Sequence, residues 1–155
     1  MGFFGIRSVA EYERLAVFQM SGRFAGLRGP GIVFITPGQT VHSTIDLREQ
    51  IQDIPDQHCL TKDSVVVIVD PIVFYQIRDP EKAILTVNDP LNAIISVART
   101  TLRAVVGDLE LLDVTGNREG IASSLRARLS EESDRWGIDI TNVEIADLKL
   151  QPEVE

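Results

Sequence analysis

Residues 64–107 read SVVVIVDPIVFYQIRDPEKAILTVNDPLNAIISVARTTLRAVVG, and the pattern changes from strand to helix within this stretch. Its first part, Ser64–Arg78, is rich in Val, Ile, Phe and Tyr, which favour strands. Asp79-Pro80 and Asp89-Pro90 each place an N-cap carboxylate before a proline in the first helical turn. Over Leu91–Gly107 the apolar residues recur every three or four positions, which predicts a helix with Gly107 as its C-cap.

The chain before this stretch carries strand patterns separated by turn residues. Glu11–Gln19 is predicted to form the first strand, and Ile32–Ile35 a short buried one. Gly29-Pro30-Gly31 marks a turn between them. Apolar and polar residues alternate over Thr44–Ile54, which predicts a half-buried strand. Pro71 has no N–H to donate, so we expect a bulge or a sheet edge there.

After residue 107 the sequence predicts a second long helix and then a closing strand. Thr115–Arg135 has helical spacing and is predicted to stop at Gly137. The closing strand runs to Leu150, and its apolar parity shifts twice, which predicts bulges near Thr141-Asn142 and Ala146-Asp147. The order favours an α+β fold: a largely antiparallel, bulged sheet in the first half, followed by helices and a closing strand.

Size and composition limit the class of protein. The chain has 155 residues, enough for one domain, with 44% hydrophobic and 25% charged residues, as in soluble globular proteins. The longest apolar run, residues 65–69, is far below the roughly 18 residues that a membrane-spanning helix needs. We therefore expect this chain itself to be soluble. Cys59 is the only cysteine, so no intramolecular disulfide forms.

The charge is distributed unevenly along the chain. The formal net charge is −8, which disfavours nucleic acid as a partner. Residues 1–62 carry six Lys/Arg and six Asp/Glu, so the whole excess of acid lies in residues 63–155. Residues 1–36 contain four arginines and two glutamates. This end of the chain can approach an anionic surface without repulsion.

Signatures of catalysis are weak throughout. The sequence contains no G-x-S-x-G, dinucleotide-binding or Walker A motif. Asp56, His58 and Cys59 are close enough to suggest a metal, but with no second ligand pair we interpret His58 as exposed and Cys59 as a small apolar residue. Asp108, Glu110 and Asp113 are interpreted as caps and solvated charges, the alternative being a catalytic carboxylate pair. We predict no enzyme activity and no cofactor or metal site.

The N-terminal segment MGFFGI offers candidate membrane-facing side chains. Phe3, Phe4 and Ile6 lie in a stretch with no obvious strand or helix partner. Exposed aromatic residues are common at membrane interfaces. The alternatives are that the phenylalanines fold back onto the sheet or belong to a frayed end.

Several short blocks share a chain order with a known family. They are Glu11-Tyr12-Glu13-Arg14 with Val17-Phe18, Gly22-Arg23, Gly29-Pro30-Gly31 with Phe34 and Pro37, Ile45-Asp46-Leu47-Arg48, Thr61-Lys62-Asp63, Val69-Asp70, Phe74-Tyr75, Thr100-Thr101-Leu102-Arg103 with Gly107, Trp136-Gly137-Ile138, Val143-Glu144-Ile145 and Asp147-Leu148. Together and in this order, from about Val9 to Leu150, they resemble the SPFH or band 7 domain of the stomatin/prohibitin/flotillin group, and within it the stomatin-like branch.

The resemblance implies a non-enzymatic scaffold. Such domains line the cytoplasmic face of membranes, self-associate into large homo-oligomers, and organise or regulate membrane proteins such as channels and proteases. It implies one domain over residues 1–155, with a β-rich, membrane-proximal part (1–79) and a part with the helices and the closing strand (80–150). A soluble adaptor that binds a protease or another partner protein without lipid contact is the alternative. The family usually has a membrane anchor before this domain and a coiled coil after it, and both are expected to be absent here.

Three residues near the end of the chain are candidates for an oligomer or partner interface. Trp136 is an aromatic residue of the kind that dominates interface hot spots, although core packing under the helix end is the alternative. Leu148 and Leu150 lie on the closing strand. An edge strand offers unpaired backbone groups to a partner.

Overall fold

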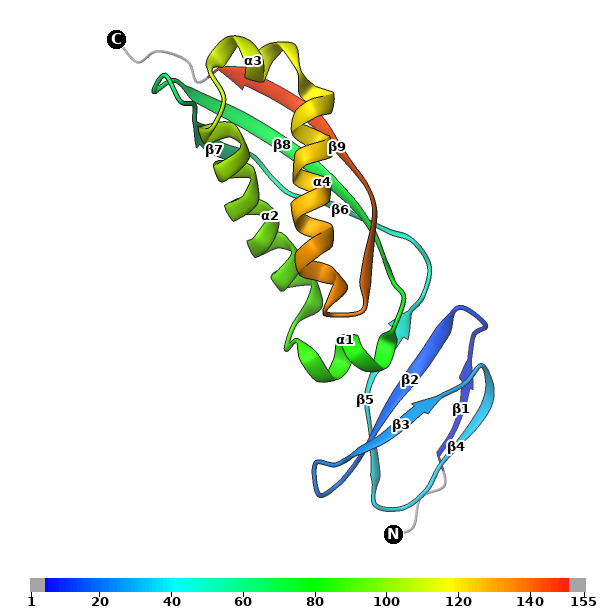
Figure 1. Cartoon of the computed structure of the whole chain (residues 1–155). Coiled ribbons are helices and arrows are strands. Elements are labelled where there is room, and N and C mark those ends of the chain that lie inside the picture. The colour runs from blue at the N-terminus through cyan, green and yellow to red at the C-terminus, as the bar shows by residue number, and fades with distance from the viewer. Residues whose placement is uncertain (1–4, 151–155) are drawn as a thin grey trace.

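The computed structural model describes residues 5–150, which form two lobes (Figure 1). The lower lobe holds β1 to β5. The upper lobe holds all four helices and the remaining strands. The bounds are β1 Gly5–Val9, β2 Glu13–Gln19, β3 Phe24–Arg28, β4 Gly31–Ile35, β5 Gln39–Asp46, β6 Gln50–Asp53, β7 Gln57–Leu60, β8 Val66–Ile77, α1 Pro80–Thr86, α2 Pro90–Gly107, α3 Leu111–Gly116, α4 Arg118–Asp134 and β9 Ile138–Leu150.

The lower lobe is built from two small antiparallel sheets. β1 pairs with β4, and β2 lies between β3 and β5. Their inward side chains form a separate small core, which consists of Val9, Leu15, Val17, Val33 and Ile35 with Ala25 and Val41 packed against it. This lobe therefore has its own hydrophobic centre, away from the helices.

The upper lobe is organised around β8, the central strand of an antiparallel sheet. β6 and β7 pair one after the other along one edge of β8, and β9 pairs along the whole of the other edge. Pro71 falls opposite the connection between β6 and β7, where no ladder N–H is required, and its carbonyl accepts the N–H of Ile54 at 3.0 Å. The β8–β9 register shifts between Asp70 and Pro71, as predicted, and the extra residue of this bulge is on β9, opposite Pro71.

Both bulges predicted in the closing strand are also confirmed. The register of β8 against β9 skips one residue between Ile140 and Asn142, and one between Ile145 and Asp147. Thr141 and Ala146 are the extra residues. Each bulge restores the apolar residues that follow it to the side of the sheet that the helices cover.

The helices cover one face of this sheet (Figure 1). The N-caps predicted at Asp79 and Asp89 are confirmed, since each carboxylate accepts a backbone N–H of the first turn. α2 and α4 pack against each other, and α4 lies along β9. Their buried stripes, which include Ile94, Ala98, Leu102, Ile121, Leu125 and Leu129, join the inward residues of β6 to β9 in the main core. The predicted α+β fold is confirmed.

The prediction of one continuous strand over Thr44–Ile54 is wrong, because β5 ends at Asp46 and β6 begins at Gln50. The Asp46 carboxylate accepts the backbone N–H of Arg48 at 2.9 Å and also binds its guanidinium. This side-chain bond competes with the ladder and turns the chain. The Arg48 guanidinium then lies 3.8 Å from the centre of the Tyr12 ring. β5 stays in the lower lobe, and β6 begins the upper sheet.

Two further boundaries differ from the predictions, and some short elements were not predicted. The first predicted strand starts at Glu13, because Glu13 N–H bonds to the Ala10 carbonyl in a turn. α4 starts at Arg118, because the Asn117 side chain caps it by accepting the Gly120 N–H at 2.9 Å. Four short elements were not predicted: β1, β3, β7 and α3. β1 depends on β4, a strand distant in sequence, whereas β3 and β7 pair with their sequence neighbours β2 and β8 but are too short to show a clear period.

Gly137 connects two turns of the upper lobe, the one between β8 and α1 and the one between α4 and β9. It ends the turn between α4 and β9 with φ +71°, and its carbonyl accepts the N–H groups of Arg78 and Asp79 at 2.8 and 2.9 Å. A Cβ at this position lies 2.5 Å from the Asp79 carbonyl oxygen. The β8–α1 corner and the start of β9 therefore meet at a site that only glycine fits.

We predict that Gly137→Ala lowers the free energy of unfolding by more than a left-handed backbone alone costs, about 1–2 kcal/mol. Gly38→Ala is the matched control, because Gly38 has φ +90° but no atom within 4 Å of its added Cβ. Urea unfolding of both variants measures the difference. Equal losses in the two variants contradict the close contact at Gly137.

Candidate functional site

The outer face of the β1–β4 pair is apolar and exposed. Ile6 lies directly opposite Phe34, and Ser8 opposite Ile32. Ile6, Phe34 and Ile32 are 66%, 62% and 71% exposed. Val9, Val33 and Ile35, on the other side of the same two strands, point into the core of the lower lobe. We call Ile6, Ile32 and Phe34 the ribbon face, and contiguous exposed apolar side chains of this kind mark an interaction surface.

The sequence analysis found part of this surface. Ile6 is exposed, as a membrane-facing residue must be, while Phe3 and Phe4 lie outside the described residues. The prediction that Ile32–Ile35 is wholly buried is wrong, because only Val33 and Ile35 point inward. Residues 32–35 are all apolar, so no alternation of polar and apolar residues shows which side each one faces. Only the pairing of β4 with β1 shows that Ile32 and Phe34 are the exposed pair.

The lower lobe carries arginines that are not matched by ion pairs. Within residues 5–150, Arg7, Arg14, Arg23 and Arg28 take part in no salt bridge. Arg14 instead donates to the backbone carbonyls of Glu11 and Glu13. The lobe that bears the ribbon face therefore also presents free positive charge.

The three predicted interface residues lie at different depths. Trp136 is buried in the main core, with the Arg135 guanidinium 5.4 Å from the centre of its ring. Leu148 is buried in the same core near the other end of β9, opposite Val69, whereas Leu150 at the end of β9 is exposed. Their role at an interface stays a prediction, and Leu150 is the one whose side chain is free to reach a partner.

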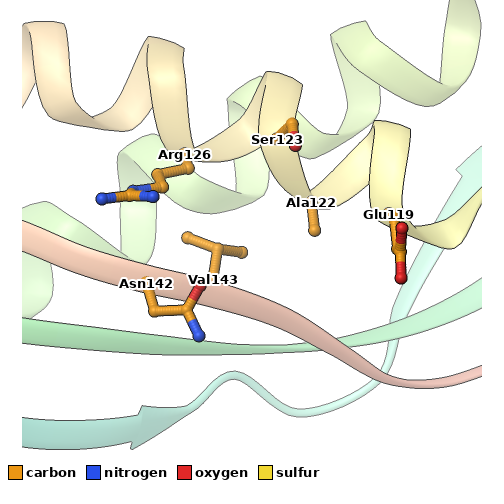
Figure 2. A pocket seen from close by; sticks show the side chains of 6 residues that line it. All are labelled: Glu119, Ala122, Ser123, Arg126, Asn142 and Val143. Atoms are coloured by element: carbon orange, nitrogen blue, oxygen red, sulfur yellow. The ribbon is translucent and has the colours of Figure 1, made fainter.

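A shallow groove of ≈ 250 Å³ separates α4 from β9. Figure 2 shows Ala122 and Val143 pointing toward each other across it, with Glu119 and Arg126 at opposite ends. Ser123 carries a hydroxyl on this lining, but none of the six lining residues is a histidine that activates it. The groove has no arrangement that supports covalent or acid–base chemistry.

The acidic residues that the sequence analysis considered for catalysis lie on the surface. Asp108 is 3.9 Å from Arg128, Glu110 precedes α3, and Asp113 is in its first turn. All three are exposed. Cys59 is buried and His58 exposed, as predicted, so they point to opposite sides of β7. In the described part of the chain no three His, Cys, Asp or Glu residues are placed to hold a metal ion.

An acidic cluster surrounds Asp70 on the face of the upper sheet that the helices leave open. Asp70 lies opposite Asp147, and Asp53 and Asp56 approach it from β6 and the β6–β7 connection. Its Oδ1 is buried and has no hydrogen-bond partner among residues 5–150. Burial raises the pKa of the Asp70 carboxyl, and a proton shared with Asp53 and the neighbouring negative charges raise it further.

The match to a family model covers almost the whole chain. A model described as SPFH domain / Band 7 family matches residues 7–155. The chain belongs to the SPFH/Band 7 family. The two bulges of β9 and the glycine joint at residue 137 therefore lie within its SPFH domain.

Relatives of this SPFH domain come from archaea and animals. It is 44% identical over 147 residues to an uncharacterised protein of Methanocaldococcus jannaschii, covering 95% of this chain and 73% of that protein. It is 39% identical over 145 residues to a stomatin homolog of Pyrococcus horikoshii, covering 94% and 54%. It is 36% identical over 154 residues to Stomatin-4 of Caenorhabditis elegans, covering 99% and 55%. The chain thus spans about half the length of the two stomatin relatives.

Membrane crossing by a helix is not a feature of the described residues. Between residues 5 and 150, no helix combines the length and the apolar composition that a crossing requires.

We predict that Asp70→Asn raises the free energy of unfolding at pH 7. An acid whose pKa is raised by folding binds its proton more tightly in the folded state, so wild-type stability falls as pH rises from the ordinary value of 3.8 through the raised pKa. The gain from Asp70→Asn shrinks as pH falls and vanishes below the ordinary value. Urea unfolding across this pH range measures it.

The control for this prediction is Asp108→Asn, which changes the net charge equally but removes an exposed carboxylate beside Arg128. If the free energy of unfolding rises equally in both variants, the effect comes from net charge alone. That result contradicts the special position of Asp70.

Proposed function

We propose that this chain is the membrane-surface domain of a non-enzymatic scaffold, and that the ribbon face is its lipid contact. The observation that carries the proposal is the register of β1 against β4, which gathers Ile6, Ile32 and Phe34 on one exposed face. Burying such side chains in the interfacial region of a bilayer removes apolar surface from water. Membership of the SPFH/Band 7 family supports a membrane-associated scaffold role.

The distribution of charge also favours contact between the lower lobe and an anionic membrane. The unpaired arginines of the lower lobe are attracted to anionic headgroups, each by about 1 kcal/mol when it lies near the surface. The acidic excess lies in residues 63–155, most of which belong to the upper lobe. With the ribbon face on the membrane, the lower lobe lies between the lipid and the acidic upper lobe (Figure 1).

The upper lobe is the part that we assign to protein contacts. We propose that it self-associates laterally into homo-oligomers, with the edge of β9 and Leu150 at the contact, and that the assembly organises membrane proteins such as channels or proteases on the cytoplasmic face. An exposed strand edge supports this assignment, because its unpaired backbone groups are available to a neighbour.

Liposome flotation tests the lipid contact. We expect the chain to float with vesicles that contain phosphatidylserine, and binding to weaken at high salt. Ile6→Ser/Phe34→Ser should lower the binding constant by about a hundredfold, because each buried apolar side chain contributes roughly 1.5 kcal/mol. The fold of the variant is checked by its thermal unfolding.

Leu112→Ser is the matched control, since Leu112 is 83% exposed on α3, in the other lobe. If Leu112→Ser loses as much vesicle binding as the double variant, the assignment of the lipid contact to the ribbon face is contradicted. No flotation by the wild-type chain under any condition contradicts lipid contact and favours the soluble adaptor.

A further inference from the structure

The upper sheet has one covered and one open face. Val67, Val69 and Val73 of β8 point toward the helices and are fully buried. Their neighbours Ile72 and Phe74 point to the other side and are only partly buried. The four helices lie together on one side of the sheet in Figure 1. The face away from them, which we call the open face, carries the outward side chains of β6 to β9, most of which are exposed or partly buried, while Ile68 of β8 is 9% exposed.

The centre of the open face is apolar and its flanks are acidic. Ile51 of β6 lies opposite Phe74, and both are apolar. One step along β8, Ile72 lies between Asp53 of β6 and Glu144 of β9. The next outward row pairs Asp70 with Asp147. Ile51, Phe74 and Ile72 thus form a short apolar strip that ends at Asp70. Asp53 lies on its β6 side, and Glu144 and Asp147 lie on its β9 side, followed by one cation, Lys149, opposite Ile68.

These carboxylates have no cationic partner within the described chain. Asp53, Asp70, Glu144 and Asp147 take part in none of its salt bridges. The buried Oδ1 of Asp70 also lacks a hydrogen-bond donor within residues 5–150. An uncovered apolar strip with unneutralised acids beside it is complementary to apolar side chains that have lysine or arginine on either side.

We propose that the open face docks a basic amphipathic helix of a partner protein. The apolar stripe of the helix covers Ile51, Ile72 and Phe74, as helices cover the other face of this sheet. Lysines or arginines on the two borders of the stripe then reach Asp53 of β6 on one side and Glu144 and Asp147 of β9 on the other, and Asp70 lies at the end of the apolar strip on β8 itself.

Two other occupants fit the open face less well. An anionic membrane is repelled by its carboxylates. A second copy of this chain offers no suitable helix among those described, because the apolar stripes of α2 and α4 are already buried in the core. The proposal is independent of the lipid contact of the ribbon face, which lies on the other lobe.

The test uses a labelled amphipathic peptide of leucine and lysine, with helical spacing, and follows its binding by fluorescence anisotropy at physiological salt. We expect micromolar binding by the wild-type chain. The variant Asp53→Asn/Glu144→Gln/Asp147→Asn should bind about tenfold more weakly, the loss expected when three partly exposed ion pairs are removed. Ile51→Ser, at an exposed position, should weaken binding without changing the net charge.

The matched control is Asp108→Asn/Asp113→Asn/Glu131→Gln, which removes the same charge from exposed positions outside the open face. Thermal unfolding verifies that each variant is folded. Absence of binding by the wild-type chain overturns the proposal. Equal weakening in the two triple variants overturns it as well, because the peptide then responds only to net charge.

Discussion

The pairing of β8 with β9 is the constraint on which the rest of the upper lobe depends. Eleven Cα pairs join the two strands, although β9 carries two extra residues. The bulges at Thr141 and Ala146 keep the inward residues of β9 under α4, and Gly137 fixes where the strand begins. With β8 held on both edges, its alternating side chains form a core on one face and leave the other face open.

The local features were predictable from the sequence, because their causes are local. The caps at Asp79 and Asp89 and the two parity shifts of the closing strand, one of them opposite Pro71, all depend on a few neighbouring residues. The break after Asp46 depends on a hydrogen bond from Arg48 to a side chain, which alternating hydrophobicity does not reveal. β1 was missed because it is stabilised by β4, a strand distant in sequence. β3 and β7 pair with neighbouring strands, and they were missed because segments of five and four residues show too little periodicity.

The candidate surfaces were less predictable than the fold. Ile6 was identified because it is apolar near the chain end, but Ile32 and Phe34 are recognised only through their register with β1. The open face depends in the same way on pairings between β6, β8 and β9, which place Ile72 between two acids. Surfaces formed by cross-strand rows need the topology, whereas strands and helices follow from periodicity. The two surfaces lie on different lobes and have opposite charge surroundings, which suits a domain that contacts lipid at one place and protein at another.

The most direct test of the lipid contact is the depth of a spin label on the ribbon side of β1. Ser8 lies opposite Ile32 on the exposed side, and the only native cysteine, Cys59, is buried, so Ser8→Cys can be labelled selectively while the ribbon face stays intact. On anionic vesicles, the account predicts that a nitroxide at position 8 becomes more accessible to oxygen than to an aqueous nickel complex, while one at position 112 stays accessible to nickel. Equal accessibility to nickel at both positions contradicts the account.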